Sequence, residues 1–307
     1  MLPCRLRASR GGVTMRWLVA LDESEFSERI IGWMRAFPHS KQTAVTVVHV
    51  LAPLDVPETI GLTGQQLLLQ QQGAMVEALL QRVRRLLEES FADVEVILRE
   101  GVPSREILQV IQERRPDLVV SGMQGLYRSP GFTIGGVAQR LLSYAPCSLM
   151  LVPGKAQPGD GLRIMLATDG SEDARRAARV VAELPGVRET MIVSVVRPLG
   201  AEKAVLERFQ PEESRKMEAA FLRRRRAEAR KALAECECLL RQAVMVVRAR
   251  VIAGHPAEAI VRAARRDAVD LLVVGSRGLT GMKATALGSV SQTVAQLAPC
   301  PVLIVKP

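Results

Sequence analysis

The chain has 307 residues, a formal net charge of +10, and 48% hydrophobic and 24% charged residues, which are ordinary globular proportions. At about 150 residues per domain, this length predicts two domains. Aromatic residues make up only 3%, which disfavours a protein that stacks single-stranded nucleic acid on aromatic side chains. Five cysteines and three histidines supply neither a disulfide framework nor a histidine-rich metal site, and they favour a reducing, cytoplasmic location. No apolar run reaches the ~18 residues that a membrane helix needs.

Apolar runs alternate with segments of helical periodicity along the chain. In the first half we expect strands at 16–21, 43–51, 94–99, 118–120 and 148–152, and helices at 24–37, 65–90, 104–114 and 136–142. The same order returns from Arg163 to Val305. Continuous apolar runs are typical of strands buried on both faces, and strand–helix alternation predicts a parallel, doubly wound sheet. Ligands of such sheets bind beyond the carboxyl ends of the strands.

The second half of the chain repeats the first. Three segments recur at an offset of 153: Pro116–Val120 as Val269–Val273, Gly101–Pro103 as Gly254–Pro256, and Ala145–Cys147 as Ala298–Cys300. Asp22 recurs as Asp169 at an offset of 147, so the second copy carries about six extra residues after its first strand. We therefore predict two homologous α/β domains, at 15–153 and 162–307. They are joined by a Pro- and Gly-containing linker at 154–161. Residues 1–14 lack the apolar core of a secretory signal and are predicted to form a disordered extension.

A glycine pattern follows the predicted fourth strand of each copy. Its spacing is Gly-x2-Gly-x9-Gly, with Gly122, Gly125 and Gly135 in the first copy and Gly275, Gly278 and Gly288 in the second. Glycine lets the backbone approach a ribose or a phosphate closely. The helix that begins at the third glycine offers free N–H groups and a positive dipole end to a phosphate. The pattern therefore predicts a phosphate-binding loop.

Hydroxyl side chains distinguish the two loops. In the second copy Ser289 and Ser291 are expected to donate hydrogen bonds to a phosphate. Ser289 and Gln292 also fit a capping box with Ser289 at the N-cap, an arrangement that needs no ligand. In the first copy Gly136 and Ala138 take the places of the two serines. The second copy is therefore the stronger predicted site.

An aspartate ends the first strand of each copy. At the carboxyl edge of a sheet, Asp22 and Asp169 can accept hydrogen bonds from ribose hydroxyls or an adenine amine, although each could instead cap the following helix. ATP hydrolysis needs a positioned base near the γ-phosphate, and no carboxylate or histidine occurs within 277–291. We expect no catalytic residues and at most slow, incidental hydrolysis.

These features together resemble the UspA superfamily of universal stress proteins, in its ATP-binding branch. The resemblance covers Arg16 to Val305 and rests on the two aspartates, the Gly-x-Pro turns, the glycine loops and the Ala-Pro-Cys segments. It implies two tandem five-stranded domains of the Rossmann-like, adenine nucleotide α-hydrolase-like fold. It also implies a stress-response or regulatory protein that binds ATP or another adenine nucleotide, with or without Mg²⁺. Family members pair their final strands, so 149–152 and 302–305 are expected to associate as an intramolecular pseudo-dimer.

The resemblance also implies which residues hold the nucleotide. In the second copy they are Ala167, Thr168, Asp169, Val195, Gly275, Arg277, Gly278, Gly288, Ser289, Val290 and Ser291. Carried over to the first copy, they are Ala20, Asp22, Val50, Gly122, Gly125, Gly135 and Gly136. No metal ligands are implied.

Three alternatives stay open at this point. One is an ATP-cleaving enzyme of the related α-hydrolase-like fold. Such enzymes usually carry a Ser-Gly-Gly-x-Asp-Ser loop, where this chain has Asp22–Ser24 and Asp169–Ser171. Another is a nucleotide-free scaffold. The third is a binder of nucleic acid or acidic proteins that uses the basic run Arg223–Lys231, although such a run is most often a solvated helix face.

Cysteine and histidine residues outside these motifs are expected to be structural. His49 is predicted to be a core or edge histidine, and Cys147 and Cys300 to be small buried side chains. Cys236 and Cys238 lie two residues apart in a helical segment and should point to different faces, without forming a metal site.

Overall fold

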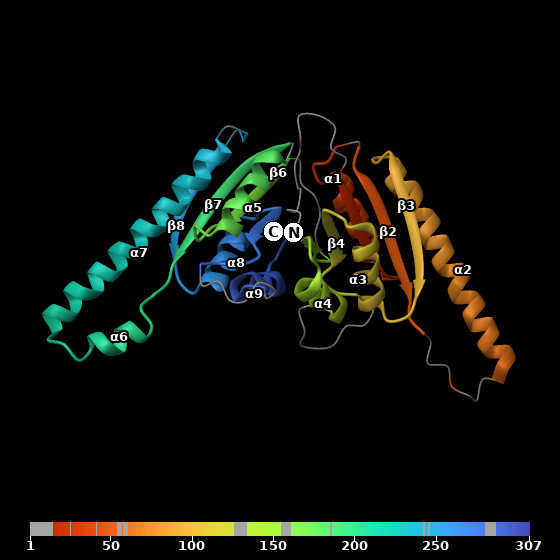
Figure 1. Cartoon of the computed structure of the whole chain (residues 1–307), viewed down its shortest axis with the longest axis horizontal. Helices are drawn as coiled ribbons and strands as arrows, with labels where there is room; N and C mark the ends of the chain where they lie inside the picture. Colours follow the sequence, from red (N-terminus) through yellow and green to blue (C-terminus); the bar gives the residue numbers. More distant parts are fainter. Residues whose placement is uncertain are drawn as a thin grey trace. The chain divides into compact units, whose positions relative to one another are not determined.

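The computed structural model divides the chain into two compact units, residues 1–158 and 159–307. It describes residues 15–24, 26–40, 42–53, 57, 61–125, 134–154, 161–184, 186–241, 243–244, 246–279 and 287–307. The predicted extension at 1–14 and most of the predicted linker, 155–160, lie outside these residues. Each unit is a five-stranded parallel sheet flanked by helices, which confirms the predicted α/β fold of two tandem domains (Figure 1).

Unit 1 contains five strands and four helices among its described residues. They are β1 (Arg16–Leu21), α1 (Phe26–Ala36), β2 (Ala44–Leu51), α2 (Gly61–Glu88), β3 (Asp93–Glu100), α3 (Pro103–Arg114), β4 (Leu118–Gly122), α4 (Gly136–Tyr144) and β5 (Ser148–Val152). The strand order is β3-β2-β1-β4-β5 and all pairs are parallel. The direction of winding reverses between β1 and β4. Right-handed crossovers therefore place α1 and α2 on one face of the sheet and α3 and α4 on the other.

Unit 2 repeats this plan with one addition. Its elements are β6 (Leu162–Ala167), α5 (Glu172–Glu183), β7 (Val187–Val196), α6 (Ala201–Leu206), α7 (Pro211–Leu240), β8 (Val246–Ala253), α8 (Pro256–Arg266), β9 (Leu271–Gly275), α9 (Ser289–Leu297) and β10 (Val302–Val305). The strand order is β10-β9-β6-β7-β8, again parallel. The short helix α6 was not predicted; it lies between β7 and α7, where the second copy carries its extra residues.

The strand register fixes which residues of the two units are equivalent. Ala20 pairs with Val48 in unit 1, and Ala167 pairs with Val193 in unit 2. Residues at the ends of β2 and β7 therefore correspond at an offset of 145, so that Val50 matches Val195. The reversal of winding in unit 2 lies between β6 and β9, and a ligand crevice is expected beyond the carboxyl ends of these strands.

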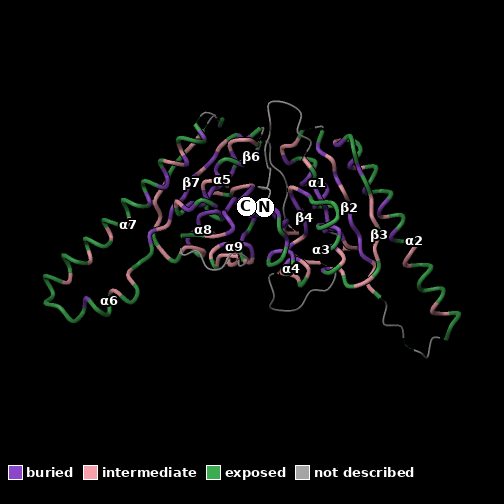
Figure 2. The backbone as a smooth tube through the Cα atoms, in the orientation of Figure 1, coloured by how far each residue is buried: buried purple, intermediate pink, exposed green. Residues whose placement is uncertain are grey.

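The long helices α2 and α7 are buried over only part of their length. In α2 the buried residues begin at Val76, and in α7 they begin at Ala229. Figure 2 shows the amino-terminal parts of both helices as exposed or intermediate, and the leucines at 67–69 are all exposed. Residues 65–72 were expected to begin an amphipathic helix that packs on the sheet or on the other copy; the structure shows a helix here whose first turns are mostly exposed. Among the described residues, no helix is long and apolar enough to cross a membrane.

We predict that the two units unfold in separate steps. Both tryptophans of the chain, Trp17 and Trp33, lie in unit 1, so tryptophan fluorescence reports on that unit alone. Leu87 in α2 and Leu240 in α7 occupy equivalent, fully buried positions. Leu87→Ala should lower the free energy of unfolding of unit 1 by about 2–5 kcal/mol, because it leaves a cavity in the core. The fluorescence transition in urea should move to lower concentration.

Leu240→Ala is the matched control. It should leave the fluorescence transition unchanged and lower only the part of the far-ultraviolet circular dichroism transition that belongs to unit 2. Equal fluorescence shifts in both variants would contradict separate unfolding.

Candidate functional site

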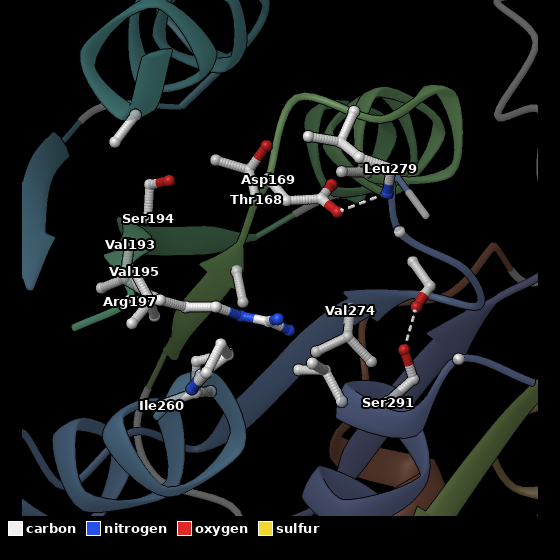
Figure 3. A pocket seen from close by; sticks show the side chains of 18 of the residues that line it. Thr168, Asp169, Val193, Ser194, Val195, Arg197, Ile260, Val274, Leu279 and Ser291 are labelled. Carbon is white, nitrogen blue, oxygen red and sulfur yellow. Dashed lines mark hydrogen bonds between the residues drawn. The ribbon is translucent and has the colours of Figure 1, made fainter. Parts of the chain in front are cut away.

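A pocket of about 330 Å³ opens in unit 2 beyond the carboxyl ends of β6, β7 and β9 (Figure 3). Its volume lies within the ~300–1,000 Å³ that is usual for small-molecule sites. All eleven residues predicted for the second copy line this pocket. The pocket is at the reversal of winding in unit 2, where a doubly wound sheet binds its ligands.

Twelve further residues line the pocket and were not predicted from the sequence. They are Ala174, Val193, Ser194, Val196, Arg197, Arg225, Glu228, Ala229, Pro256, Ile260, Val274 and Leu279. Most come from β7, α7 and the start of α8, whose positions over the sheet depend on tertiary packing. Residues two positions apart in a strand face the same side, so the prediction of Val195 could have been extended to Val193 on β7.

One end of the pocket is aliphatic. Val195, Ile260 and Val274 form its walls, and the latter two are buried. The Val193 carbonyl accepts a hydrogen bond from the Thr168 N–H at 2.9 Å. Val195 lies two residues farther along β7, so its backbone N–H and C=O point to the same side, into the space where β6 has ended. This end can accommodate a flat apolar group with a hydrogen-bonding edge.

Asp169 lies between the aliphatic end and the glycine loop. Its Oδ1 accepts a hydrogen bond from the Ser171 N–H at 2.9 Å, and its Oδ2 accepts one from the Leu279 N–H at 3.0 Å. Figure 3 shows the second of these bonds. A methyl group at Gly278 would come within 2.5 Å of Asp169 Oδ2, so only glycine fits beside this carboxylate. The aspartate therefore joins the loop after β6 to the loop after β9.

Two further contacts join these loops, and both involve the start of α5. Ser171 is the N-cap of α5; its Oγ accepts from the Ala174 N–H at 3.2 Å and donates to the Arg277 carbonyl at 3.2 Å. Asp173 is buried, and its Oδ2 accepts from Ser276 Oγ at 2.7 Å and from Arg277 Nε at 3.1 Å. Asp173, which was not predicted as a site residue, holds the first two residues after β9 through these bonds.

The glycines of the loop are required by the protein itself. A methyl group at Gly275 would lie 2.7 Å from the carbonyl carbon of Asp173, and one at Gly288 would lie 3.2 Å from the Ser276 oxygen. The strand-end glycine thus allows α5 to approach β9. That it also lets a ligand approach the backbone stays a prediction.

The start of α9 differs by one residue from the prediction. Gly288 is the N-cap, with φ −67° and ψ 142°, and its carbonyl accepts from the Gln292 N–H at 2.9 Å. Ser289 is the first helical residue and is exposed. The predicted capping box is therefore wrong, because Gln292 lies one position too far along the helix. The N–H groups of residues 289–291, in the first turn, have no partner within the helix.

The predicted role of Ser291 also needs correction. Its Oγ donates a hydrogen bond to the Gly275 carbonyl at 2.7 Å and is buried (Figure 3). The hydroxyl proton is used inside the protein, so this side chain cannot donate it to a phosphate while the bond is intact. Ser291 instead ties α9 to the end of β9.

In unit 1 the predicted residues lie at the equivalent places. Ala20 and Val50 are buried near the ends of β1 and β2, and Gly122 ends β4. A methyl group at Gly125 would come within 2.6 Å of Asp22 Oδ2, so this aspartate also lies against its glycine loop.

The helix that follows the loop of unit 1 begins at Gly136, as predicted. The N-cap of α4 is Gly135 and not Gly136, as in α9. The Gly135 N–H donates to the Met123 carbonyl at 2.7 Å, which matches the 2.8 Å bond from the Gly288 N–H to the Ser276 carbonyl. The described ends of the loop are thus joined by the same backbone bond in both units.

The side chains around the loop of unit 1 are different. Phe26 and Met123, both buried, occupy the positions of Asp173 and Ser276. His49 takes the position of Ser194; it is buried, its Nδ1 lies 3.1 Å from the Leu21 oxygen and its Nε2 lies 3.3 Å from Glu23 Oε1. The expectation of a core histidine is confirmed.

The cysteines are placed as expected. Cys147, Cys236 and Cys300 are buried, whereas Cys238 is exposed. Burial raises the pKa of the Cys300 thiol to about 12. Burial also raises the pKa of the Cys236 thiol, whose Sγ lies behind the pocket, 3.4 Å from Thr168 Oγ1. Among the residues that the structure describes, no group of three or more His, Cys, Asp or Glu side chains could hold a metal ion.

The basic run of α7 is mostly exposed. Arg224 pairs with Glu228 at 2.9 Å, one turn away on the helix surface. Arg225 is the exception, because it turns toward the pocket and donates to the carbonyls of Arg197 and Pro198 at 3.0 and 2.9 Å. The run is thus largely a solvated helix face.

Comparison with known proteins gives one consistent result. The model of the universal stress protein family matches residues 14–153 and 162–306. A universal stress protein of Thermus aquaticus is 38% identical over 146 residues, which are 47% of this chain and 97% of that protein. Universal stress protein Rv2623 of Mycobacterium tuberculosis is 24% identical over 317 residues, 97% of this chain and 98% of that protein.

Among solved structures, a universal stress protein from Archaeoglobus fulgidus has the same fold. Its TM-score is 0.63 at 19% identity, and the match covers 95% of this chain and 98% of that one. At this level of identity the likeness concerns the fold alone.

We predict that Asp173 stabilises the glycine loop. Asp173→Asn should lower the free energy of unfolding of unit 2 by about 1–3 kcal/mol, because the buried Ser276 hydroxyl and the partly buried Arg277 guanidinium lose a charged acceptor. The measurement is urea unfolding followed by far-ultraviolet circular dichroism. Glu172→Gln is the matched control: it changes the adjacent acid, whose ion pairs with Arg175 and Arg179 are at the surface, and should cost less than about 1 kcal/mol. Equal losses would contradict a special role for Asp173.

We also predict that Cys236 reacts more slowly than Cys238. At pH 8, iodoacetamide should modify Cys238 at least roughly tenfold faster, because Cys236 is buried and its raised pKa keeps the thiol protonated. Both cysteines lie on the tryptic peptide 232–241, so fragmentation of this peptide by tandem mass spectrometry over time assigns a rate to each, and Cys238→Ser removes the fast reaction. Equally fast labelling of Cys236 would mean that the wall behind Thr168 is open.

Proposed function

The chain belongs to the universal stress protein family, and from this membership we propose that unit 2 binds an adenine nucleotide, with ATP as the leading ligand. The observation that carries the proposal is that all eleven predicted residues surround a single pocket. The protein would act as a stress-response or regulatory module whose state depends on nucleotide occupancy.

The two ends of the pocket match the two ends of a nucleotide. The aliphatic end offers Val195, Ile260 and Val274 to the base, together with a backbone edge on β7. The other end offers the first-turn N–H groups of α9 to the phosphates, where the helix dipole favours negative charge. Asp169, whose carboxylate lies against the start of the glycine loop, would accept hydrogen bonds from the ribose hydroxyls.

Binding without efficient catalysis fits the chemistry of the site. Asp173, the buried carboxylate next to the loop, already accepts from Ser276 and Arg277, and it pairs with Arg176 at 3.2 Å. It is therefore not available as a base for attacking water. Mg²⁺ usually needs only one or two protein carboxylates when nucleotide phosphates supply other ligands, so a magnesium ion would enter together with ATP.

Unit 1 is proposed to bind nucleotide more weakly. Gly136 offers no hydroxyl group where unit 2 has Ser289, and the buried Phe26 and Met123 replace the polar pair that supports the loop in unit 2. We expect one tight site in each chain.

A negative charge at the start of α9 tests the proposal. Ser289→Glu places a carboxylate on an exposed position in the first helical turn, where it interacts favourably with the helix dipole. The same charge repels a phosphate. Isothermal titration with ATP should show a loss of affinity of at least about tenfold, while the melting temperature stays equal or rises.

Gly136→Glu in unit 1 is the matched control, because Gly136 is exposed and a Cβ there meets nothing within 4 Å. It should leave the tight site unchanged. Wild-type protein that gives no heat with millimolar ATP would refute the proposed function. Unchanged ATP affinity in Ser289→Glu would refute the placement of the phosphates at α9.

A further inference from the structure

Five charged residues line the pocket of unit 2, and four of them have partners. Arg225 pairs with Glu202 at 2.6 Å, Arg277 bonds Asp173, and Glu228 pairs with Arg224. The carboxylate of Asp169 accepts two backbone N–H groups. The fifth is Arg197, whose guanidinium has no hydrogen bond or ion pair among the residues that the structure describes, although the residue itself is exposed at the pocket mouth.

The backbone of Arg197 is held by the strand before it and by a hydrogen bond from α7. It directly follows β7, and its carbonyl accepts a hydrogen bond from Arg225 Nη1 at 3.0 Å. Figure 3 shows its side chain extending from the end of β7 into the pocket, toward Val274. The guanidinium thus enters the pocket beside Val274, one of its aliphatic walls.

We propose that Arg197 binds the phosphate chain of the nucleotide from the side opposite α9, so that the affinity of unit 2 increases with the number of phosphates. The inference rests on the proposed function and adds a residue and a selectivity to it. A guanidinium presents five N–H donors in a planar fork that matches phosphate oxygens, and such charge-assisted hydrogen bonds are stronger than neutral ones. Because no acidic side chain in the described part of the chain pairs with Arg197, its charge is available to an anionic ligand.

Unit 1 lacks this residue. Ala52 is the equivalent of Arg197 at the offset of 145 that the strand register defines. Arg197 is therefore particular to unit 2, as are the hydroxyls at the start of α9. Neither the glycine loop nor the resemblance to the family pointed to it.

The test compares ligands that differ only in phosphate number. Wild-type protein, Arg197→Ala and Arg197→Lys are titrated with adenosine, AMP, ADP and ATP by isothermal calorimetry. Arg197→Ala should weaken ATP binding by about 10- to 100-fold and change adenosine binding by less than about twofold. Arg197→Lys should fall between, because it keeps the charge but loses the fork. The loss should shrink as salt screens the interaction.

Arg226→Ala is the matched control. Arg226 is exposed on α7 and does not line the pocket, so this variant removes the same charge elsewhere and should bind ATP as the wild type does. Equal losses in Arg226→Ala and Arg197→Ala would reduce the effect to net charge and overturn the inference.

Two further outcomes would also overturn it. If Arg197→Ala binds ATP normally, the guanidinium does not contact the phosphates. If it loses adenosine and ATP equally, the side chain stacks on the base instead. Wild-type protein that binds none of the four ligands would refute the proposed function together with this inference, whereas normal binding by Arg197→Ala would refute the inference alone. Melting curves of each variant show whether unit 2 is still folded.

Discussion

The site of unit 2 depends on one carboxylate that holds two backbone loops together. Asp169 accepts N–H groups from Ser171 and from Leu279, which lie 108 positions apart in the sequence. Both loops follow parallel strands on the two sides of the reversal of winding, where the sheet itself provides no bond between them. This bridge fixes the start of the glycine loop, whose residues 277–279 form part of the pocket wall.

The two units show which parts of this arrangement are general and which are not. The contact between aspartate and glycine, and the backbone bond that begins the last helix, occur in both units. The side chains that support the loop differ: Asp173 and Ser276 form a buried hydrogen bond, whereas Phe26 and Met123 are apolar at the same positions. A hydrogen-bonded polar pair fixes the direction of the loop, because the bond has a preferred geometry. An apolar pair fills the same volume but imposes no direction on the loop. The same backbone contacts thus occur with a polar pair of side chains in unit 2 and with an apolar pair in unit 1.

The sequence was sufficient for the fold, because repeats and continuous apolar strands define both the number of units and the parallel sheet. It also placed Asp169 and the glycines correctly around one pocket. The predicted N-cap of α9 was wrong by one residue. A serine that follows a glycine can be either the N-cap or the first helical residue, and the sequence alone does not decide between the two. It missed Asp173 and Arg197 because their roles come from the packing of α5 on β9 and from the end of β7. Neither contact leaves a local sequence pattern.

The incomplete burial of α7 has a mechanical consequence. Arg225 lies just before Ala229, where the buried part of the helix begins, and its guanidinium grips the carbonyls of Arg197 and Pro198 as well as Glu202. These hydrogen bonds connect the exposed amino-terminal half of α7 to the rim of the pocket. A force that tilts this half of α7 must either break the bonds of Arg225 or move Arg197 and Pro198 together with the helix.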